Sequence, residues 1–106
     1  MATIGNFTKN ADGSFTGEII TLSVQSKDVR IIPNPEPSSE NAPSHRITVG
    51  SAEIGAAWRK RSSDGRDYLG LKLDDPSFAA PIFANLFAEP DGQTYVLVWT
   101  RQRMRH

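Results

Sequence analysis

The sequence predicts an all-β, mainly antiparallel domain that forms a small barrel or a strongly bent sheet of about seven to eight short strands. Apolar and polar residues alternate with a period of two, which is the period of strands and not of helices. Short runs of β-branched and aromatic residues are separated by Gly, Asp, Asn and Pro, which favour turns. An oligonucleotide-binding-like (OB-like) barrel is one architecture with this pattern, and at most one short helix is expected.

Length and composition indicate a single domain over residues 1–106. The chain has 106 residues, of which 38% are hydrophobic and 23% are charged, and its formal net charge is zero. A chain of this length builds one hydrophobic core. Because cysteine is absent, disulfides and thiolate zinc sites are excluded. No run approaches the ~20 apolar residues of a membrane-spanning helix, and residues 1–5 do not resemble a signal peptide, so we expect a cytoplasmic protein.

The first strands are expected to form a hairpin. Runs over 3–8 and 14–24 flank a turn in which Asp12 and Gly13 readily adopt positive φ. Residues 29–32 predict a short third strand, which ends at a proline because proline has no backbone donor. Residues 33–44 contain four prolines and no large apolar residue, so they predict a flexible loop within the domain.

The central hairpin has the clearest turn signal. Residues 46–49 are expected to be extended, and Gly50-Ser51 turns the chain into a strand over 52–60, where Gly55 marks a bulge or a close backbone approach. Asp64-Gly65 then predicts a two-residue turn into a strand over 68–73.

The segment 77–88 fits two structures. Its apolar residues fit one face of a helix that Ser77 would cap. Pro81 would interrupt that helix, so we prefer a strand over 81–88. Its partner would be a strand over 95–101, reached through a turn at residues 90–92.

The predicted two-residue turn places Arg61 opposite Tyr68. Lys72 lies on the same side of the ribbon as this pair, and that side points away from the core. A base would stack on this tyrosine while the cations contact phosphates. Solvated faces of antiparallel sheets commonly carry the same residue types, so an ordinary exposed face is the alternative. The candidate nucleic-acid face consists of Arg59, Arg61, Tyr68 and Lys72, and the core-facing side consists of Ile54, Trp58, Leu69, Leu71 and Leu73.

Basic residues are concentrated toward the C-terminus, where eight of the twelve lysines and arginines lie in residues 59–106. The last of them, Arg101, Arg103 and Arg105 with His106, fit either a phosphate-contacting tail or a solvated chain end.

No residue pattern indicates a catalytic site, a metal site or a cofactor site. Asp74-Asp75 is typical of a turn before a proline, since neighbouring strand residues point to opposite faces. Neither His45 nor His106 has a partner in the sequence that would form a triad. No glycine-rich loop precedes a helix. We therefore expect a protein that is not an enzyme and needs no cofactor.

The last strand predicts burial on both faces. Trp99 shares one face with Tyr95 and Leu97, while Val96 and Val98 lie on the other. Such a strand is either central in the sheet or part of a dimer interface, for which the candidate residues are Phe83, Phe87, Tyr95 and Trp99.

Several short segments form a pattern that extends over nearly the whole chain. They are Ile4-Gly5-Asn6-Phe7-Thr8, Ile54-Gly55-Ala56-Ala57-Trp58, Gly65-Arg66-Asp67-Tyr68-Leu69, Leu71-Lys72-Leu73-Asp74-Asp75-Pro76-Ser77-Phe78, Pro81-Ile82-Phe83-Ala84-Asn85-Leu86 and Leu97-Val98-Trp99. In these segments the chain resembles a bacterial family, the domain-of-unknown-function family 736. The resemblance implies a small bacterial protein encoded in plasmid or conjugative-transfer neighbourhoods. It supplies no catalytic or binding residue.

Two functions follow as hypotheses. The first is an accessory protein of mobile elements that binds single-stranded nucleic acid, DNA in particular, on the hairpin of residues 52–73. The alternative is a protein–protein interaction module, either a homodimer or the partner of an unknown protein, without nucleic-acid binding.

Overall fold

The computed structural model describes residues 2–22, 25–34, 42–76, 78 and 80–99, and within these every regular element is a β-strand. The strands confirm the all-β prediction, and the segment that also fitted a helix is the strand β7. They are β1 (Ala2–Lys9), β2 (Phe15–Ile20), β3 (Gln25–Pro33), β4 (His45–Val49), β5 (Ala52–Arg61), β6 (Asp67–Leu73), β7 (Ile82–Ala88) and β8 (Thr94–Trp99).

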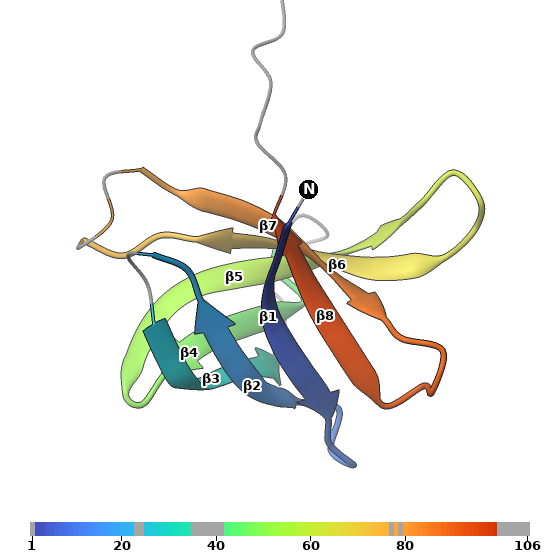
Figure 1. Cartoon of the computed structure of the whole chain (residues 1–106), viewed down its shortest axis with the longest axis horizontal. Coiled ribbons are helices and arrows are strands. Elements are labelled where there is room, and N and C mark those ends of the chain that lie inside the picture. Colours follow the sequence, from blue (N-terminus) through green and yellow to red (C-terminus); the bar gives the residue numbers. More distant parts are fainter. Residues whose placement is uncertain (1, 23–24, 35–41, 77, 79, 100–106) are drawn as a thin grey trace, which may run out of the picture.

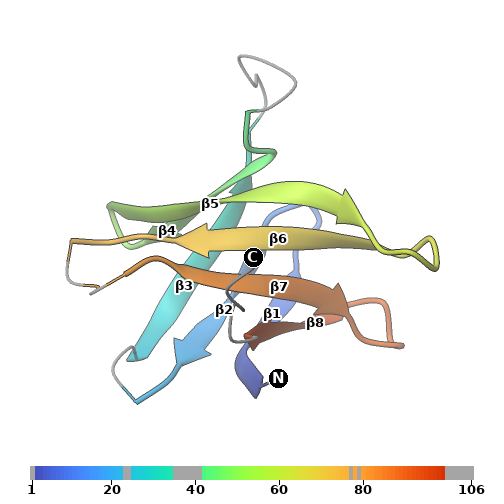
Figure 2. The same cartoon turned by 90° about the horizontal axis from the view of Figure 1, so that it is seen from above.

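The strands form a closed barrel in which each pairs antiparallel with the next (Figure 1). The barrel closes where β1 pairs with β8, in a register that includes Ala2 opposite Trp99 and Phe7 opposite Tyr95. Seen from above, β5, β6 and β7 run side by side over the crossing strands β1 to β3 (Figure 2). The order is that of an up-and-down barrel, which differs from the five-stranded Greek-key order of OB folds.

The barrel interior is filled by side chains from every strand. Eight-stranded barrels are just wide enough for inward-pointing side chains to fill them, and here the inward rows consist largely of β-branched and aromatic residues and leucine. The largest fully buried side chains are Phe7, Ile19, Val29, Ile31, Ile47, Leu73, Leu86 and Leu97.

Glycines on the inward rows allow the strands to bend tightly around this core. A Cβ atom at Gly17 would lie 2.7 Å from Cγ of Phe7 and would also collide with the carbonyl oxygen of Asn6. At Gly55 a Cβ atom would collide with the carbonyl oxygen of Lys72, and the register of β4 and β5 shifts beside this glycine. The bulge and close approach predicted at Gly55 are therefore confirmed.

The β5–β6 turn is longer than predicted. Ser62 and Arg66 close it through a 2.8 Å bond from the Ser62 amide to the Arg66 carbonyl, and the Gly65 amide donates to the Ser62 carbonyl at 3.0 Å. Gly65 has φ +89°, as expected of a type I turn followed by a left-handed glycine. The predicted two-residue turn is wrong, and its pairing is wrong by one residue. Arg59 lies opposite Leu69, and Arg61 lies opposite Asp67.

The predicted strand bounds differ from the observed ones mainly near residue 20 and near the proline-rich segment. β2 ends at Ile20, and β3 begins at Gln25, earlier than the expected start at residue 29. Pro33 is the last residue of β3 and pairs with His45. Beyond it, the Asn34 amide donates to the Ser44 carbonyl at 2.8 Å, which ties the ends of this connection together. Residues 35–41 and the C-terminal run 101–106 lie outside the described residues.

Candidate functional site

The observed register divides the predicted nucleic-acid face between the two sides of the barrel wall. Arg59 follows the inward row, because its partner Leu69 is buried and Ala57, two residues earlier, is fully buried. Arg61, two residues further along β5, belongs to the same row as Arg59 but lies at the tip of the hairpin, beyond the barrel. Tyr68 and Lys72 point outward. The expectation that all four share one face is wrong, because the turn shifts the pairing by one residue and so exchanges the faces.

Trp58 is also on the other side from the one expected. It lies directly opposite Gly70 on the outer surface and is half-buried there. A Cβ atom at Gly70 would be 2.8 Å from Cε of Lys60, so the lysine side chain lies over this glycine. Because Gly70 has no side chain, the surface beside the Trp58 indole ring is flat, and the Lys60 side chain covers the glycine.

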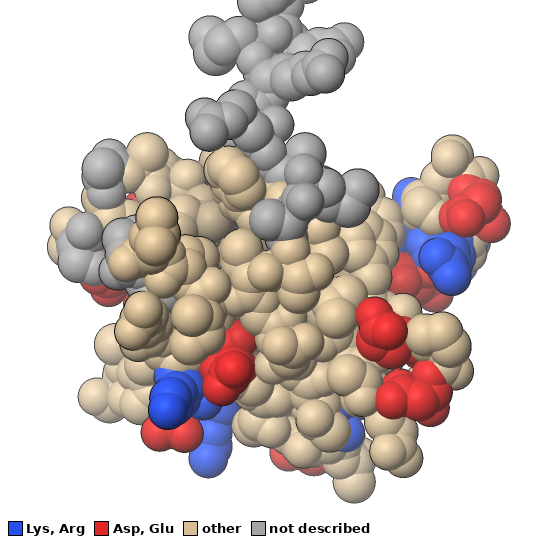
Figure 3. Space-filling view, in the orientation of Figure 1, with Lys and Arg blue, Asp and Glu red and all other residues tan. Residues whose placement is uncertain are grey.

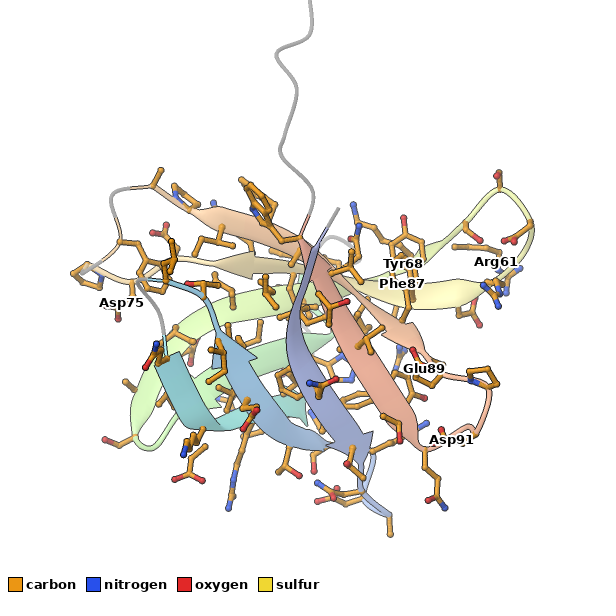
Figure 4. The ribbon with its side chains drawn as sticks, in the orientation of Figure 1. Arg61, Tyr68, Asp75, Phe87, Glu89 and Asp91 are labelled. Carbon is orange, nitrogen blue, oxygen red and sulfur yellow. The ribbon has the colours of Figure 1, made fainter. Side chains whose placement is uncertain are left out.

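Aromatic and lysine side chains alternate across the outer surface of β5, β6 and β7. Lys60 lies opposite Tyr68, and Lys72 lies opposite Phe83. The rings of Tyr68 and Phe87 are neighbours, with centroids 5.1 Å apart and planes at 32° (Figure 4). The aromatic–lysine face is defined here as Trp58, Lys60, Tyr68, Lys72, Phe83 and Phe87.

No carboxylate lies among the outward positions 56, 58 and 60 of β5, 68, 70 and 72 of β6, and 83, 85 and 87 of β7. Within the described part of the chain, neither Lys60 nor Lys72 forms an ion pair. Acidic residues are instead found in the adjoining turns, such as Asp64 and Glu89. Figure 3 shows the side of the barrel on which β1, β2 and β8 lie in front, where charged atoms gather near the hairpin tips and the lower border around a broad uncharged area. The aromatic–lysine face therefore combines positive and apolar side chains, and no carboxylate within it neutralises the two lysines.

The predicted interface residues are likewise divided between the two sides of the wall. Phe83 and Phe87 point outward, and Phe83 is 43% exposed. Tyr95 and Trp99 share the inward row with the fully buried Leu97 and pack against the core. The prediction that Trp99, Tyr95 and Leu97 share a face is confirmed, but these aromatic residues cannot form one outer surface with the two phenylalanines.

The second candidate site is a cavity of about 750 Å³ at one end of the barrel. This end carries the β1–β2, β3–β4, β5–β6 and β7–β8 turns, and the cavity is called the barrel mouth below. Its lining is aromatic and aliphatic below and charged at the rim. The lining residues are Lys9, Asp12, Gly13, Phe15, Pro33, His45, Arg59, Lys60, Arg61, Asp67, Tyr68, Leu69, Leu86 and Tyr95.

His45 is the buried polar residue of the barrel mouth, with only 5% of its surface exposed. Its Nδ1 shares a 2.8 Å hydrogen bond with Oγ of Ser44, and its ring lies 6.1 Å from that of Phe15. Burial lowers the pKa of His45, and the charges of Arg59 and Lys9 lower it further. The imidazole is therefore neutral at neutral pH. Sequence reasoning missed this position, although the alternation with Ile47 places both residues on one inward row.

Some charged side chains at the rim of the barrel mouth form ion pairs, and others do not. Arg61 bonds Asp67 through its Nε at 3.1 Å, and Asp12 accepts hydrogen bonds from Ser14 that lower the pKa of its carboxyl group. Lys9 and Arg59 form no ion pair with any described residue. Lys60, which also lines the mouth, forms no ion pair with a described residue, and neither does the Asp12 carboxylate. The mouth thus keeps an excess of two positive charges beside a neutral imidazole.

Other sites considered from the sequence have structural explanations. The Asp74 amide donates to the Ile54 carbonyl at 2.7 Å, and the Asp75 carbonyl accepts from Phe78 at 2.8 Å, as in a turn. Within the described residues, no three His, Cys, Asp or Glu side chains are grouped so that they could hold a metal ion. The described residues also contain no helix with the length and apolar character needed to cross a membrane.

Comparison with known proteins identifies a family but no individual relative. No curated protein and no solved structure matches the chain significantly. A family model described as "Protein of unknown function (DUF736)" matches residues 3–102, which is nearly the whole length and confirms the resemblance found in the sequence. With a match of that extent, this eight-stranded barrel belongs to the DUF736 family.

Proposed function

We propose that this protein is a non-enzymatic accessory that binds single-stranded nucleic acid, DNA in particular, on the aromatic–lysine face. The observation that carries the proposal is the set of outward positions within residues 56–60, 68–72 and 83–87, which holds no carboxylate and where rings and lysines lie side by side. Glu53, the exposed acid of β5, lies outside this set and pairs with Arg46. The plasmid and conjugative-transfer setting implied by the family resemblance is one in which single-stranded DNA occurs. The proposed surface retains Tyr68 and Lys72 from the sequence prediction and replaces the two arginines.

Stacking would supply most of the affinity. Proteins that bind single strands without reading sequence combine aromatic platforms with a positive track for the backbone, and each stacked base contributes about 1–3 kcal/mol. Tyr68 and Phe87 already lie with their rings 5.1 Å apart, so two neighbouring platforms exist before any ligand binds. Phe83, at 43% exposure, lies beside Lys72 and extends the apolar surface along β7.

Phosphate contacts would be few. Lys60 and Lys72 are the cations of this face, and both are exposed. Each neutralised phosphate of a single strand contributes about −0.7 to the slope of log K against log salt, so two contacts give about −1.4. A shallow slope of this size separates the proposed mode from binding by a polycationic tail.

The test is a fluorescence-anisotropy titration of a short labelled oligothymidylate and of a matched duplex, at low and near-physiological salt. We expect saturable binding of the single strand and weaker binding of the duplex. Phe87→Ala and Lys72→Ala are the informative variants, because neither residue lines the barrel mouth. Ile20→Ala and Lys27→Ala are matched controls, since both residues are exposed on strands away from the aromatic–lysine face. Unchanged affinity in both Phe87→Ala and Lys72→Ala would exclude this face as the site.

A protein-binding function is the second candidate, and the exposed Phe83 is the observation that favours it. Phe83 and Phe87 point outward from β7, and Val96 points outward from the neighbouring β8. A second copy of the chain would cover this surface in a homodimer. Light scattering at micromolar and at higher concentration distinguishes the candidates, since a dimer that Phe83→Asp dissociates would support the interaction module.

A further inference from the structure

The barrel mouth has the size of a small-molecule site, with an apolar part and a strongly charged rim. Pockets that hold small ligands usually have volumes of ~300–1,000 Å³ and are mainly apolar with a few placed polar groups. The mouth has a volume of about 750 Å³, and Phe15, Leu69, Leu86 and Tyr95 supply its apolar part. An eight-stranded barrel is wide enough to hold one small ligand, and the mouths of β-barrels are common ligand sites.

The filled interior limits how deep a ligand can enter. Below the mouth the inward rows contain fully buried residues such as Phe7, Ile31 and Leu97. An extended acyl chain would need a channel along the barrel axis, and these side chains occupy it. The ligand is therefore compact.

Aromatic rings define one wall of the cavity. Phe15 and Tyr95 meet edge to face, with centroids 4.8 Å apart and an interplanar angle of 79°, and the His45 ring lies next to Phe15. The geometry is fixed by three different strands, β2, β8 and β4, so the wall is formed before any ligand arrives. A flat ring can pack against such a wall with gains beyond simple area burial.

The charges of the cavity favour an anion. Lys9, Arg59 and Lys60 are without carboxylate partners among the described residues, while Arg61 and Asp67 compensate each other. Asp12 is the remaining carboxylate of the lining, so three unpaired cations face one unpaired carboxylate. His45 adds a neutral ring that can form a hydrogen bond but contributes no charge to the cavity. An arginine presents paired donors that match the oxygens of a carboxylate or a phosphate.

We propose that the barrel mouth binds a compact aromatic anion, meaning a single ring system that carries a carboxylate or a phosphate group. Arg59 and Lys9 bind the anionic group, and the wall formed by Phe15, Tyr95 and His45 packs against the ring. The site meets the aromatic–lysine face at Lys60 and Tyr68, which line the mouth as well. The proposed anion ligands Arg59 and Lys9 line only the mouth, whereas Lys72, Phe83 and Phe87 lie outside it.

The proposal is tested by calorimetric titration of the full chain with benzoate, phenyl phosphate, a nucleoside monophosphate and inorganic phosphate. We expect at least one ring-bearing anion to bind at least about tenfold more tightly than inorganic phosphate, and the stronger of the carboxylate and phosphate arms identifies the headgroup. Equal binding of inorganic phosphate and the ring-bearing anions would overturn the aromatic requirement. Tighter binding of dodecanoate than of benzoate would overturn the compact ligand. No heat with any probe at millimolar concentration would overturn the site.

Variants separate this site from the proposed function. Arg59→Gln and Lys9→Gln should each weaken binding of the aromatic anion by about tenfold, as expected for loss of a charge-assisted hydrogen bond. Lys27→Gln is the matched control, because Lys27 is an exposed lysine outside the mouth. Phe87→Ala should leave anion binding unchanged. If Arg59→Gln fails to fold, Lys9→Gln tests the same prediction. A nitrogen-15 NMR titration of the unchanged protein then follows the amide signals of Phe15 and His45. If the ligand shifts neither signal, the proposal is overturned.

Discussion

Arg59 on β5 lies directly opposite Leu69 on β6, and Trp58, one residue earlier, lies opposite Gly70 on the other side of the wall. The first pair belongs to the inward rows that end at the barrel mouth, and the second belongs to the aromatic–lysine face. One hairpin therefore presents an arginine to a cavity and an indole to the outer surface. The two proposed binding sites meet at Lys60 and Tyr68. Arg59 and Lys9 line only the mouth, and Lys72 and Phe87 lie only on the outer face, so substitutions at these four residues change the sites separately.

Replacing Phe87 by alanine should weaken binding of single-stranded oligothymidylate by about 5-fold or more, because loss of one stacking platform costs about 1–3 kcal/mol. Ile20→Ala removes an exposed apolar side chain of β2 and should leave the affinity unchanged. Anisotropy titration with both variants makes the comparison. A loss of equal size in the two variants would indicate general destabilisation instead of stacking.

Replacing Lys72 by alanine should make the salt dependence shallower by about 0.7 in the slope of log K against log salt, since one phosphate contact is lost. The Lys27→Ala control should keep the original slope, because Lys27 lies on β3, away from the proposed surface. The slopes are measured by repeating the titration at several salt concentrations. An unchanged slope in Lys72→Ala would remove this lysine from the binding surface.

Gly17→Ala should lower the free energy of unfolding by about 1–3 kcal/mol, the range for overpacking in a filled interior. The added Cβ atom would meet the Asn6 carbonyl and the Phe7 ring, neither of which has free space to move. Gly70→Ala is the matched variant, because there the nearest atom is Cε of a flexible lysine, Lys60. Urea unfolding of both variants should show a clear loss only for Gly17→Ala, and equal losses would contradict the assigned inward and outward rows.

The stability of the fold should decrease as the pH falls below the usual range of histidine titration. The pKa of His45 is lower in the folded barrel than in the unfolded chain, so the unfolded chain binds the additional proton first. Its contribution is complete at pH values above about 6.5 and declines as the pH falls from there toward the lowered pKa of the folded state.

Urea unfolding at about pH 8 and about pH 5 measures this effect, with His45→Gln as the comparison. Removing the titrating ring should flatten the decline over this interval. The carboxyl groups of Asp12, Asp64 and Asp91 also have lowered pKa values, but they titrate at more acidic pH and so leave the interval to the histidine. An equally steep decline in His45→Gln would contradict the assignment.

Strand positions could be predicted because they depend on local alternation and turn residues, whereas the register of β5 and β6 could not. Asp64-Gly65 is compatible with a two-residue turn and with a type I turn followed by a left-handed glycine. The choice depends on the bonds of Ser62 and Arg66 and on Asp64, whose carboxylate accepts from the Ser62 hydroxyl. A difference of one residue then exchanges the faces of Arg59 and Trp58, which is why the candidate site changed more than the fold.

Contacts between distant segments were also beyond local patterns. The pairing of β1 with β8 closes the barrel, and no residue near either strand signals the other. The same holds for the barrel mouth, where Lys9, His45 and Arg59 come from three strands. Alternation from Ile47 places His45 on the inward row, but only barrel closure brings the two cations to it.

Because Ala2 and Trp99 are pairing partners, the first and last strands lie next to each other at the end of the barrel opposite the mouth. The eight strands therefore form a ring whose neighbours do not depend on where the chain begins. A circular permutant that joins Trp99 to Ala2 through a short linker and opens at Gly50-Ser51 would keep every strand pair and leave the mouth turns intact. Because the strand order is cyclic, new termini can be placed at the β4–β5 turn, which lies away from both proposed sites.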